Sequence, residues 1–275
     1  MTHLVHHAYG KTGVRLLRLD RSGTPHRILE TTVEIKLEGD FAEAYDGDNS
    51  RVLPTDTQKN TVYALARQEP FETIEALGLL LARHFLESQP QVERVTVELS
   101  ERPWQHLGKH PDTFVAAGEE RRTALVEADR EKTVLSAGIR DLLILKSSRS
   151  GFEGFPRDRY TMLKETADRL FATRLEATWR YRDPGVDAAK ERRTIEAVML
   201  EAFAVHDSKS VQQTLKAMGE AALAVSPPVE EIHLVMPNKH YLLVDLAPFG
   251  LDNPNCIFLP TDEPAGRIEG TLRRG

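Results

Sequence analysis

Residues 59–65 read Lys-Asn-Thr-Val-Tyr-Ala-Leu, and residues 212–218 read Gln-Gln-Thr-Leu-Lys-Ala-Met. Both stretches share the order threonine, apolar, any residue, alanine, apolar, which suits one face of a helix. A strand-like segment that begins Val-Glu follows each of them, at residues 92–97 and 229–234. Because the two matches occur in the same order along the chain, they indicate an internal duplication.

The first half has the alternation and spacing of two strands, two helices and a further strand. Period-two segments around the turn at Ser22-Gly23 predict a hairpin, and apolar residues at helical spacing predict helices after Pro54. In chain order we expect strands at residues 14–19 and 32–37, helices at residues 59–68 and 72–87, and a strand at residues 91–99. The second of these helices carries one apolar stripe, formed by Ile74, Leu77, Leu81 and Phe85.

The second half repeats this order. Its expected elements are strands at residues 142–145 and 194–203, a helix that starts near residue 212, and a strand at residues 229–234. The charged residues 118–133 are expected to form a solvated linker. We therefore predict an α+β protein of two tandem ββααββ domains, residues 1–132 and 133–275. Each antiparallel sheet has helices on one face only, and a ring of several copies would cover the other face.

Composition excludes several classes of protein. The chain has 275 residues and a net charge of −6 with no basic stripe, which argues against nucleic-acid binding. No segment approaches the ~18 consecutive apolar residues of a membrane span, so no membrane partner is expected. The first ten residues have no apolar signal segment, and the C-terminus lacks Ser-Lys-Leu, which together predict a cytoplasmic protein. The single cysteine, Cys256, cannot form an intramolecular disulfide.

None of the generic sequence motifs in the chain indicates a function. Gly10-Lys11-Thr12 resembles the end of a phosphate-binding loop, but the required earlier glycine would fall at Val5. His3, His6 and His7 have no carboxylate or cysteine partner at metal-ligand spacing, so no metal site is expected. Glycine-rich residues 151–155 lack the strand and helix of a dinucleotide fingerprint, and no Gly-x-Ser-x-Gly motif anchors a serine hydrolase.

Four segments, taken together, are more specific than these generic motifs. They are Tyr9-Gly10-Lys11; Thr55-Asp56-Thr57-Gln58-Lys59-Asn60-Thr61; Phe152 to Thr161 with Leu163-Lys164-Glu165-Thr166 and Asp168-Arg169; and Ser210-Val211-Gln212 with Pro237-Asn238-Lys239-His240-Tyr241. In this order they resemble the cofactor-independent urate oxidases, or uricases. The second segment is the most specific, since it resembles the family signature Thr-Asp-Ser/Thr-x-Lys-Asn-Thr.

The resemblance implies a fold, a reaction and an assembly. The fold would be two tandem tunnelling-fold (T-fold) domains in a homotetramer that encloses a tunnel. The reaction would convert urate, O2 and water into 5-hydroxyisourate and H2O2 without metal or flavin. Active sites would lie between subunits: one chain would supply Lys11, Thr55 and Asp56, and its neighbour Phe152, Leu163, Arg169, Val211, Gln212, Asn238 and His240.

These residue types suit urate, a flat anion with hydrogen-bonding edges. A stacking ring (Phe152), a planar cation (Arg169) and an amide (Gln212) match its face and edges. Backbone N–H groups of Thr55 and Asp56 at a helix start would add donors. The remaining implied roles are a proton relay of Lys11, Thr55 and His240; oxygen or water held by Asn238 and Thr55; and an apolar wall of Leu163 and Val211.

Taken singly, each residue has an ordinary explanation: Phe152 a core aromatic, Arg169 a surface ion-pair partner, Gln212 a solvated helix residue. Two other functions stay open at this point. One is another T-fold purine or pterin enzyme, such as a cyclohydrolase or a pterin synthase, although the zinc ligands of such enzymes have no counterpart here. The other is a purine-binding ring without catalysis.

Overall fold

The computed structural model describes residues 2–275, which fall into two compact units. Unit 1 contains the residues up to Ile139 together with Trp179–Arg192, and unit 2 contains Arg140–Thr178 and Arg193–Gly275. Strands β7 (Thr133–Lys146) and β8 (Phe171–Tyr181) therefore contribute residues to both units. The domain boundary expected after residue 132 stays a prediction.

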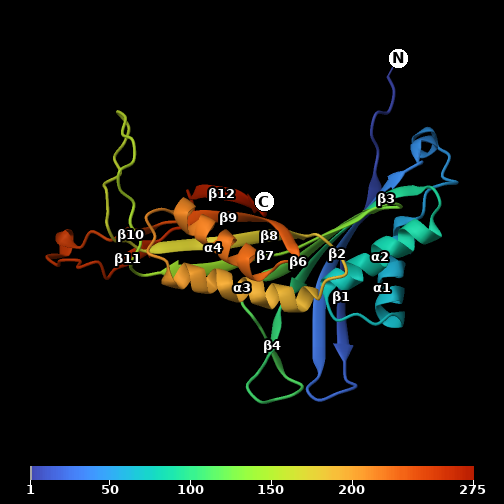
Figure 1. Cartoon of the computed structure of the whole chain (residues 1–275), viewed down its shortest axis with the longest axis horizontal. Coiled ribbons are helices and arrows are strands. Elements are labelled where there is room, and N and C mark those ends of the chain that lie inside the picture. Colours follow the sequence, from blue (N-terminus) through green and yellow to red (C-terminus); the bar gives the residue numbers. More distant parts are fainter. Residues whose placement is uncertain (1) are drawn as a thin grey trace. The chain divides into compact units, whose positions relative to one another are not determined.

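Unit 1 consists of an antiparallel sheet with helices (Figure 1). Its strands lie in the order β1-β2-β3-β6, and α2 packs against β3 and β6 while α1 contacts β1. Its elements are β1 (Tyr9–Asp20), β2 (Arg27–Gly39), the 3-10 helix η1 (Ala42–Asp46), α1 (Thr55–Gln68), α2 (Ile74–Ser88), β3 (Val92–Arg102), the short strands β4 (Trp104–His106) and β5 (Phe114–Ala116), and β6 (Arg121–Asp129).

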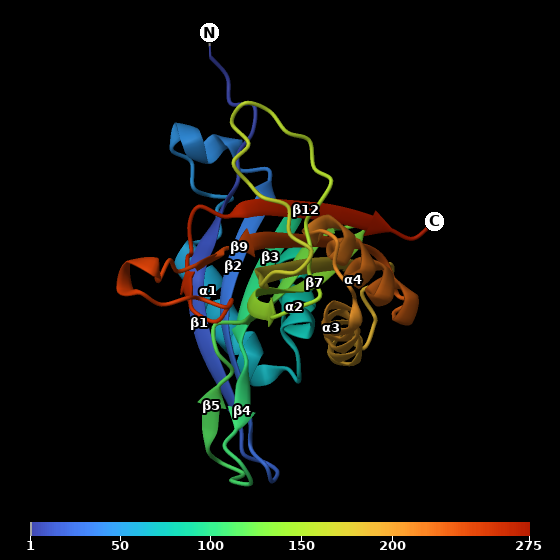
Figure 2. The same cartoon turned by 90° about the vertical axis from the view of Figure 1, so that its left-hand side faces the viewer.

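Unit 2 is organised in the same way. Strand β12 pairs antiparallel with β9, and α4 packs against both. Besides its parts of β7 and β8, its elements are α3 (Ala188–Val205), whose residues 188–192 belong to unit 1, α4 (Val211–Val225), β9 (Val229–Lys239), β10 (Tyr241–Leu243), the 3-10 helix η2 (Ala247–Phe249), β11 (Phe258–Pro260) and β12 (Gly266–Arg273). Figure 2 shows its two long excursions, the loop after β7 in yellow-green and the segment between β9 and β12 in orange.

The order of elements confirms the predicted α+β class. Two strands, two helices, a strand, a short two-stranded ribbon and a final strand occur in sequence twice, with β4–β5 as the first ribbon and β10–β11 as the second. Each unit ends at an edge strand, β1 in unit 1 and β12 in unit 2, so the sheets of one chain are open. A closed barrel therefore requires further copies of the chain.

The core of unit 1 follows the predicted periodicities. On β2, Val33, Ile35 and Leu37 are buried at every second position. All four residues of the expected α2 stripe, Ile74, Leu77, Leu81 and Phe85, are fully buried. Each such side chain stabilises the fold by about 1.5–3 kcal/mol relative to an exposed one. The stripe therefore fixes which face of α2 lies on the sheet.

Two expected elements were wrong. Residues 194–203 belong to helix α3 and not to a strand, because Ile195, Met199 and Phe203 are buried at a spacing of four. Residues 118–133 are not a linker, because most of them form β6, whose Ala124, Val126 and Ala128 are buried at a spacing of two. In both segments many charged residues lie between short apolar runs, so the sequence does not clearly show the helical period of α3 or the strand period of β6.

The helix match that suggested duplication joins non-equivalent helices. Residues 59–65 lie on α1, the first helix of its half, whereas residues 212–218 lie on α4, the second helix of its half. The strand match does join equivalent strands, β3 and β9. The repeated order of elements thus supports a duplication more firmly than the helix sequences do.

Buried charges connect the elements of unit 1. Arg192 of α3, with 5% of its side chain exposed, pairs with Glu75 of α2 and lies 3.6 Å from a carboxylate oxygen of Glu101 on β3. Arg122 of β6 reaches the other oxygen of Glu101 at 3.4 Å. Burial raises the pKa of Glu101, while the two arginines oppose that shift. Since a buried charge without a partner is costly, this network fixes α2 and the start of α3 against the sheet.

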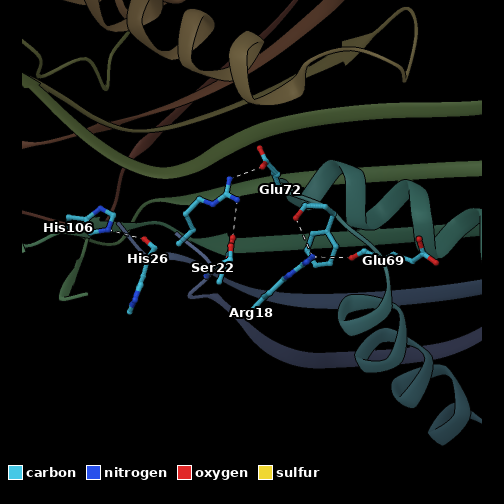
Figure 3. Close-up of polar contacts among 9 residues, drawn as sticks. Arg18, Ser22, His26, Glu69, Glu72 and His106 are labelled. Carbon is cyan, nitrogen blue, oxygen red and sulfur yellow. Dashed lines mark hydrogen bonds and ion pairs between the residues drawn. The ribbon is translucent and has the colours of Figure 1, made fainter. Parts of the chain in front are cut away.

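A second polar cluster fixes the turn end of the β1–β2 hairpin, where β1 ends and β2 begins (Figure 3). The guanidinium of Arg18 lies 4.2 Å from the centroid of the Phe71 ring and donates to the carbonyls of Glu69 and Phe71, at 3.2 and 3.3 Å. Arg27 bridges Asp20 and Glu72. These contacts hold the connection between α1 and α2 against β1, and so fix the C-terminal end of α1.

Two further features concern membrane-spanning helices and the single cysteine. Among the described residues, no helix is long and apolar enough to cross a membrane. Cys256, on the excursion between β10 and β11, is exposed.

Candidate active site

Lys11 is placed by two glycines of the first strand. At Gly10 a Cβ atom would lie 1.8 Å from the carbonyl oxygen of Ile35 on β2, so a side chain there would force the two strands apart. The register of β1 and β2 shifts between Lys11 and Val14, and Gly13 has a φ of 67°, a conformation that favours glycine. The motif Tyr9-Gly10-Lys11 therefore sets Lys11 at a bulge where a strand changes direction.

Thr55 and Asp56 are the first two residues of α1, which begins four residues before the predicted start. Pro54 stands at the N-cap, and no side chain caps this helix end. The hydroxyl of Tyr9 accepts a hydrogen bond from the backbone N–H of Leu53, at 2.9 Å, and ties the helix start to β1. The positive end of the helix dipole and its first N–H groups are therefore available to an anion.

The carboxylate of Asp56 already has partners within its own helix. Lys59 donates to one oxygen, and the amide of Asn60 donates to the other at 2.9 Å. The hydrogen bond from Lys59 and then that from Asn60 lower the pKa of Asp56, with a small contribution from the charge of Lys11. Lys59 and Asn60 of the signature therefore hold Asp56, whose backbone N–H is left to face a ligand.

Phe152 and Arg169 are brought together in unit 2 by backbone hydrogen bonds. Phe152 exchanges both backbone bonds with Thr166, at 2.8 and 3.2 Å, and the N–H of Arg169 donates to the carbonyl of Ser150 at 2.7 Å. As a result the guanidinium of Arg169 lies 5.6 Å from the centroid of the Phe152 ring. Phe155 stacks on the same ring, 4.9 Å away with an interplanar angle of 11°.

The guanidinium of Arg169 is only partly satisfied. Its Nε is buried and has no hydrogen-bond partner among the described residues. Burial lowers the pKa of Arg169, but a guanidinium stays charged in proteins. A half-buried cation beside an aromatic face, with a buried Nε that the described residues do not pair, is suited to a planar anion.

The start of α4 lies beside the same segment. The N–H of Gly151 donates to the carbonyl of Ser208 at 2.8 Å, and Ser150 and Ser208 form a parallel bridge. Ser210 caps α4 by accepting from the N–H of Gln213 at 3.1 Å. Val211 and Gln212 follow as the first two residues of the helix, Val211 buried and Gln212 exposed.

Two cations fix the approach to this helix. Lys146, which is buried, donates to the carbonyl of His206, and Arg149 donates to the carbonyls of Ala204 and Val205 at 2.6 and 3.1 Å. They satisfy carbonyls at the C-terminal end of α3, where the helix dipole favours positive charge. The link between α3 and α4 is thereby held against the end of β7.

Arg169, Asn238 and His240 line one depression of about 300 Å³ in unit 2. Asn238 lies near the end of β9, and His240 lies between β9 and β10. Leu163 is 58% exposed on the loop after Phe152 and is not among the residues of this depression. By unit, the candidate residues fall into two groups: Lys11, Thr55 and Asp56 in unit 1, and Phe152, Leu163, Arg169, Val211, Gln212, Asn238 and His240 in unit 2. Like Leu163, Phe152, Val211 and Gln212 are not among the residues that line the depression.

Several supporting residues were not predicted as such. Ser150, Ser208 and Asp168 connect the segment of Phe152 and Arg169 with the approach to α4: Ser150 forms a parallel bridge with Ser208, and its N–H donates to the Asp168 carboxylate at 3.2 Å. Asp168 stands within a quoted motif, and the only sequence signal of Ser150 and Ser208 is their position beside the quoted motifs. Among the described residues no group of three or more His, Cys, Asp or Glu side chains could hold a metal ion.

Comparison with known proteins gives a consistent result. A family model described as uricase matches residues 7–127 and 135–269. The uricase of Arthrobacter globiformis is 43% identical over 267 residues, which cover 97% of this chain and 88% of that protein. The uricase of Dictyostelium discoideum is 39% identical over 282 residues, which cover 100% of this chain and 98% of that protein.

Solved structures agree with these matches. The crystal structure of the uricase from Arthrobacter globiformis superposes with a TM-score of 0.96 at 42% identity, covering 100% of this chain and 96% of that chain. The urate oxidase from Bacillus sp. TB-90 superposes with a TM-score of 0.83 at 21% identity, covering 98% of this chain and 100% of that chain. The second match shows the shared fold alone.

Proposed function

This chain belongs to the uricase family, and we propose on that basis that it is a urate oxidase. Urate, O2 and one water give 5-hydroxyisourate and one H2O2. The observation that carries the proposal beyond family membership is the pair of Phe152 and Arg169, whose guanidinium lies 5.6 Å from the ring centroid. The buried Nε of Arg169 has no partner among the described residues, and Arg169 lines one depression with Asn238 and His240.

Unit 2 is proposed to bind the purine. Phe152 offers a ring face for stacking, and Arg169 offers a planar fork that can bond two acceptors at once. Gln212, exposed at the start of α4, can donate and accept on the opposite edge. Val211 and Leu163 are assigned to the apolar wall, with Leu163 on a loop that would have to approach the bound purine.

Unit 1 is proposed to supply backbone donors and two members of the proton relay, Lys11 and Thr55, and unit 2 the third member, His240. The open N–H groups of Thr55 and Asp56 at the start of α1 favour an anion. Lys11, Thr55 and His240 would pass the proton that urate loses, because a threonine hydroxyl can donate and accept at once. Asn238 and Thr55 would hold O2, and later water, above the ring.

The electron-rich urate ring is proposed to replace a cofactor. Once deprotonated, it passes electrons to O2, a hydroperoxide forms on the ring, and water displaces peroxide to give the hydroxylated product. The protein contributes placement and proton transfer. We therefore assign no metal and no flavin to the reaction.

The two groups of residues are proposed to meet between subunits of a homotetramer. In each unit an edge strand is open, and apolar side chains on the sheet are exposed, including Leu17 and Leu19 of β1 and Leu143 and Leu145 of β7. Open edges and exposed apolar residues favour association with further copies. A cytoplasmic location stays a prediction.

One assay tests the function. Purified protein is treated with a chelator and then mixed with urate in air-saturated buffer, while urate absorbance and peroxide are followed together. We expect one peroxide per urate consumed, at the same rate with and without chelator. Loss of activity with chelator and recovery with added metal would contradict the cofactor assignment. Urate binding without consumption would favour a purine-binding ring, and turnover of another purine or of a pterin in its place would favour the other T-fold enzymes.

A further inference from the structure

Three consecutive residues at the end of β9 are held by one short segment, residues 261–266. Both the backbone N–H and the Oγ1 hydroxyl of Thr261 donate to the carbonyl oxygen of His240, each at 2.9 Å. Asn238 pairs with Gly266 in the register of β9 and β12. The backbone on both sides of residue 239 is therefore fixed from the same side.

The residue between them is held by charge. The ammonium of Lys239 pairs with the carboxylate of Asp262, and the Lys239 side chain is only 12% exposed. The hydrogen bond from Lys239 is the largest cause of the lowered pKa of Asp262, and the charge of Arg174 adds to it. Without Asp262, a largely buried ammonium would lose its carboxylate partner, which is costly enough to move the side chain and its strand.

These contacts do not involve Phe152 or Arg169, the residues proposed to bind the purine. Phe152 and Arg169 are held by Thr166 and Ser150, on the connection between β7 and β8. Asn238 and His240 are held by residues 261–266, on the return to β12. One depression is thus lined by two independently supported segments, and a change in one support should affect one set of side chains.

We propose that Thr261 and Asp262 are positioning residues that hold His240 and Asn238 in the geometry required for proton transfer and oxygen placement. The inference rests on the proposed urate oxidase function. It assigns to residues 261 and 262 a role that their exposed, loop-like sequence does not suggest. It also predicts a kinetic signature: turnover depends on this segment, whereas the affinity for urate does not.

A threonine series tests the inference. Thr261→Val removes the hydroxyl bond to His240 but keeps the shape and the N–H bond, and Thr261→Ser restores a hydroxyl. The matched control is Thr271→Val, which removes the hydroxyl contact of 2.9 Å with Nδ1 of His233 on the same pair of strands. Urate kcat and KM are measured in air-saturated buffer, together with the thermal unfolding midpoint.

We expect Thr261→Val to lower kcat roughly 10- to 100-fold, the range that a misplacement of about 1 Å can produce. KM should stay within twofold, Thr261→Ser should recover most of kcat, and Thr271→Val should match the wild type. Asp262→Asn is the second variant and should show the same split. Wild-type kcat in Thr261→Val, or a loss that falls on KM, would overturn the inference.

A double-mutant cycle separates positioning from general damage. If Thr261 acts through His240, Thr261→Val should have little further effect on kcat when His240 is already alanine. An equal loss in both backgrounds would show a merely structural role, as would failure of both Thr261→Val and Asp262→Asn to fold. If the wild type does not consume urate, the proposed function fails first and the inference falls with it. If the wild type is active and the cycle is additive, only the inference fails.

Discussion

The two halves of the chain repeat one order of elements but place their candidate residues at different points of it. In unit 1 the group lies at the first strand and at the start of the first helix, α1. In unit 2 it lies at the connection between β7 and β8, the start of the second helix, α4, and the end of β9. The two halves therefore share an order of elements, but their candidate residues occupy non-equivalent positions in it.

The two groups also differ in their electrostatic state. The carboxylate of Asp56 is satisfied by Lys59 and Asn60 within its own helix, so unit 1 presents backbone donors. The buried Nε of Arg169 has no hydrogen-bond partner in the part of the chain that the structure describes, so unit 2 presents a cationic side chain. Under the proposed function, unit 2 would recognise the anion and contribute His240 to the proton relay, while unit 1 would supply backbone donors, Lys11 and Thr55. Loops and helix ends can diverge in this way because the sheet beneath them carries the stability.

Mixing two inactive variants should give the largest effect. If Thr55 of one subunit acts on urate bound by Arg169 of another, co-expressed Thr55→Ala and Arg169→Ala chains form some interfaces in which both groups are intact. Activity should rise from the background of either variant to a readily measured level in dual-tagged, mixed oligomers. The controls are the two single-variant oligomers, purified in the same way. Mixed oligomers as inactive as those controls would place both groups of a site in one chain.

A smaller but still large effect is expected from Arg169→Lys. The substitution keeps the charge but loses the planar fork and the unused Nε donor, and a hydrogen bond to a charged group contributes roughly 1.5–3 kcal/mol. Urate affinity should therefore fall roughly 10- to 150-fold, measured by calorimetry without O2. The matched control is Arg157→Lys, because Arg157 lies 5.3 Å from the Phe155 ring but is exposed. Equal affinities in Arg169→Lys and the wild type would remove Arg169 from the binding site.

The smallest effect is expected from Asp56→Asn. Its carboxylate is exposed and faces Lys59, and exposed ion pairs contribute little. Since the backbone N–H is unchanged, urate affinity should change by less than about threefold. The same calorimetric titration measures it. A loss as large as that of Arg169→Lys would show that the carboxylate itself binds urate, and would make the two halves more alike than the structure suggests.

Periodicity and motifs predicted most of the scaffold. The β1–β2 hairpin, the stripe of α2 and strands β3 and β9 were expected because each has one clearly apolar face. The pattern of residues 194–203 predicts a strand although they belong to helix α3, because the short polar runs between their apolar residues suit both the helical and the strand period. Strand β8 was missed altogether, although Leu175, Ala177 and Trp179 are buried at a spacing of two.

The site was predictable only in part. Motifs selected Arg169, Asn238 and His240, which line one depression. They did not select Thr261 or Ser208, whose roles depend on backbone bonds between segments far apart in the chain. Such bonds leave no periodic signal, because the carbonyl that accepts the bond belongs to any residue type. Nor did the motifs select Asp262, which pairs with Lys239 through its side chain. A different case is Lys59 and Asn60, which the motif contains but whose side-chain bonds to Asp56, three and four residues earlier on α1, it does not reveal.

The exposed thiol of Cys256 gives the protein a single built-in attachment point for a maleimide dye. Every subunit would then carry one fluorophore without any engineered substitution. Stepwise photobleaching of single particles counts the dyes, and energy transfer between differently coloured chains reports how fast subunits exchange. These are the two quantities that decide how mixed oligomers should be prepared.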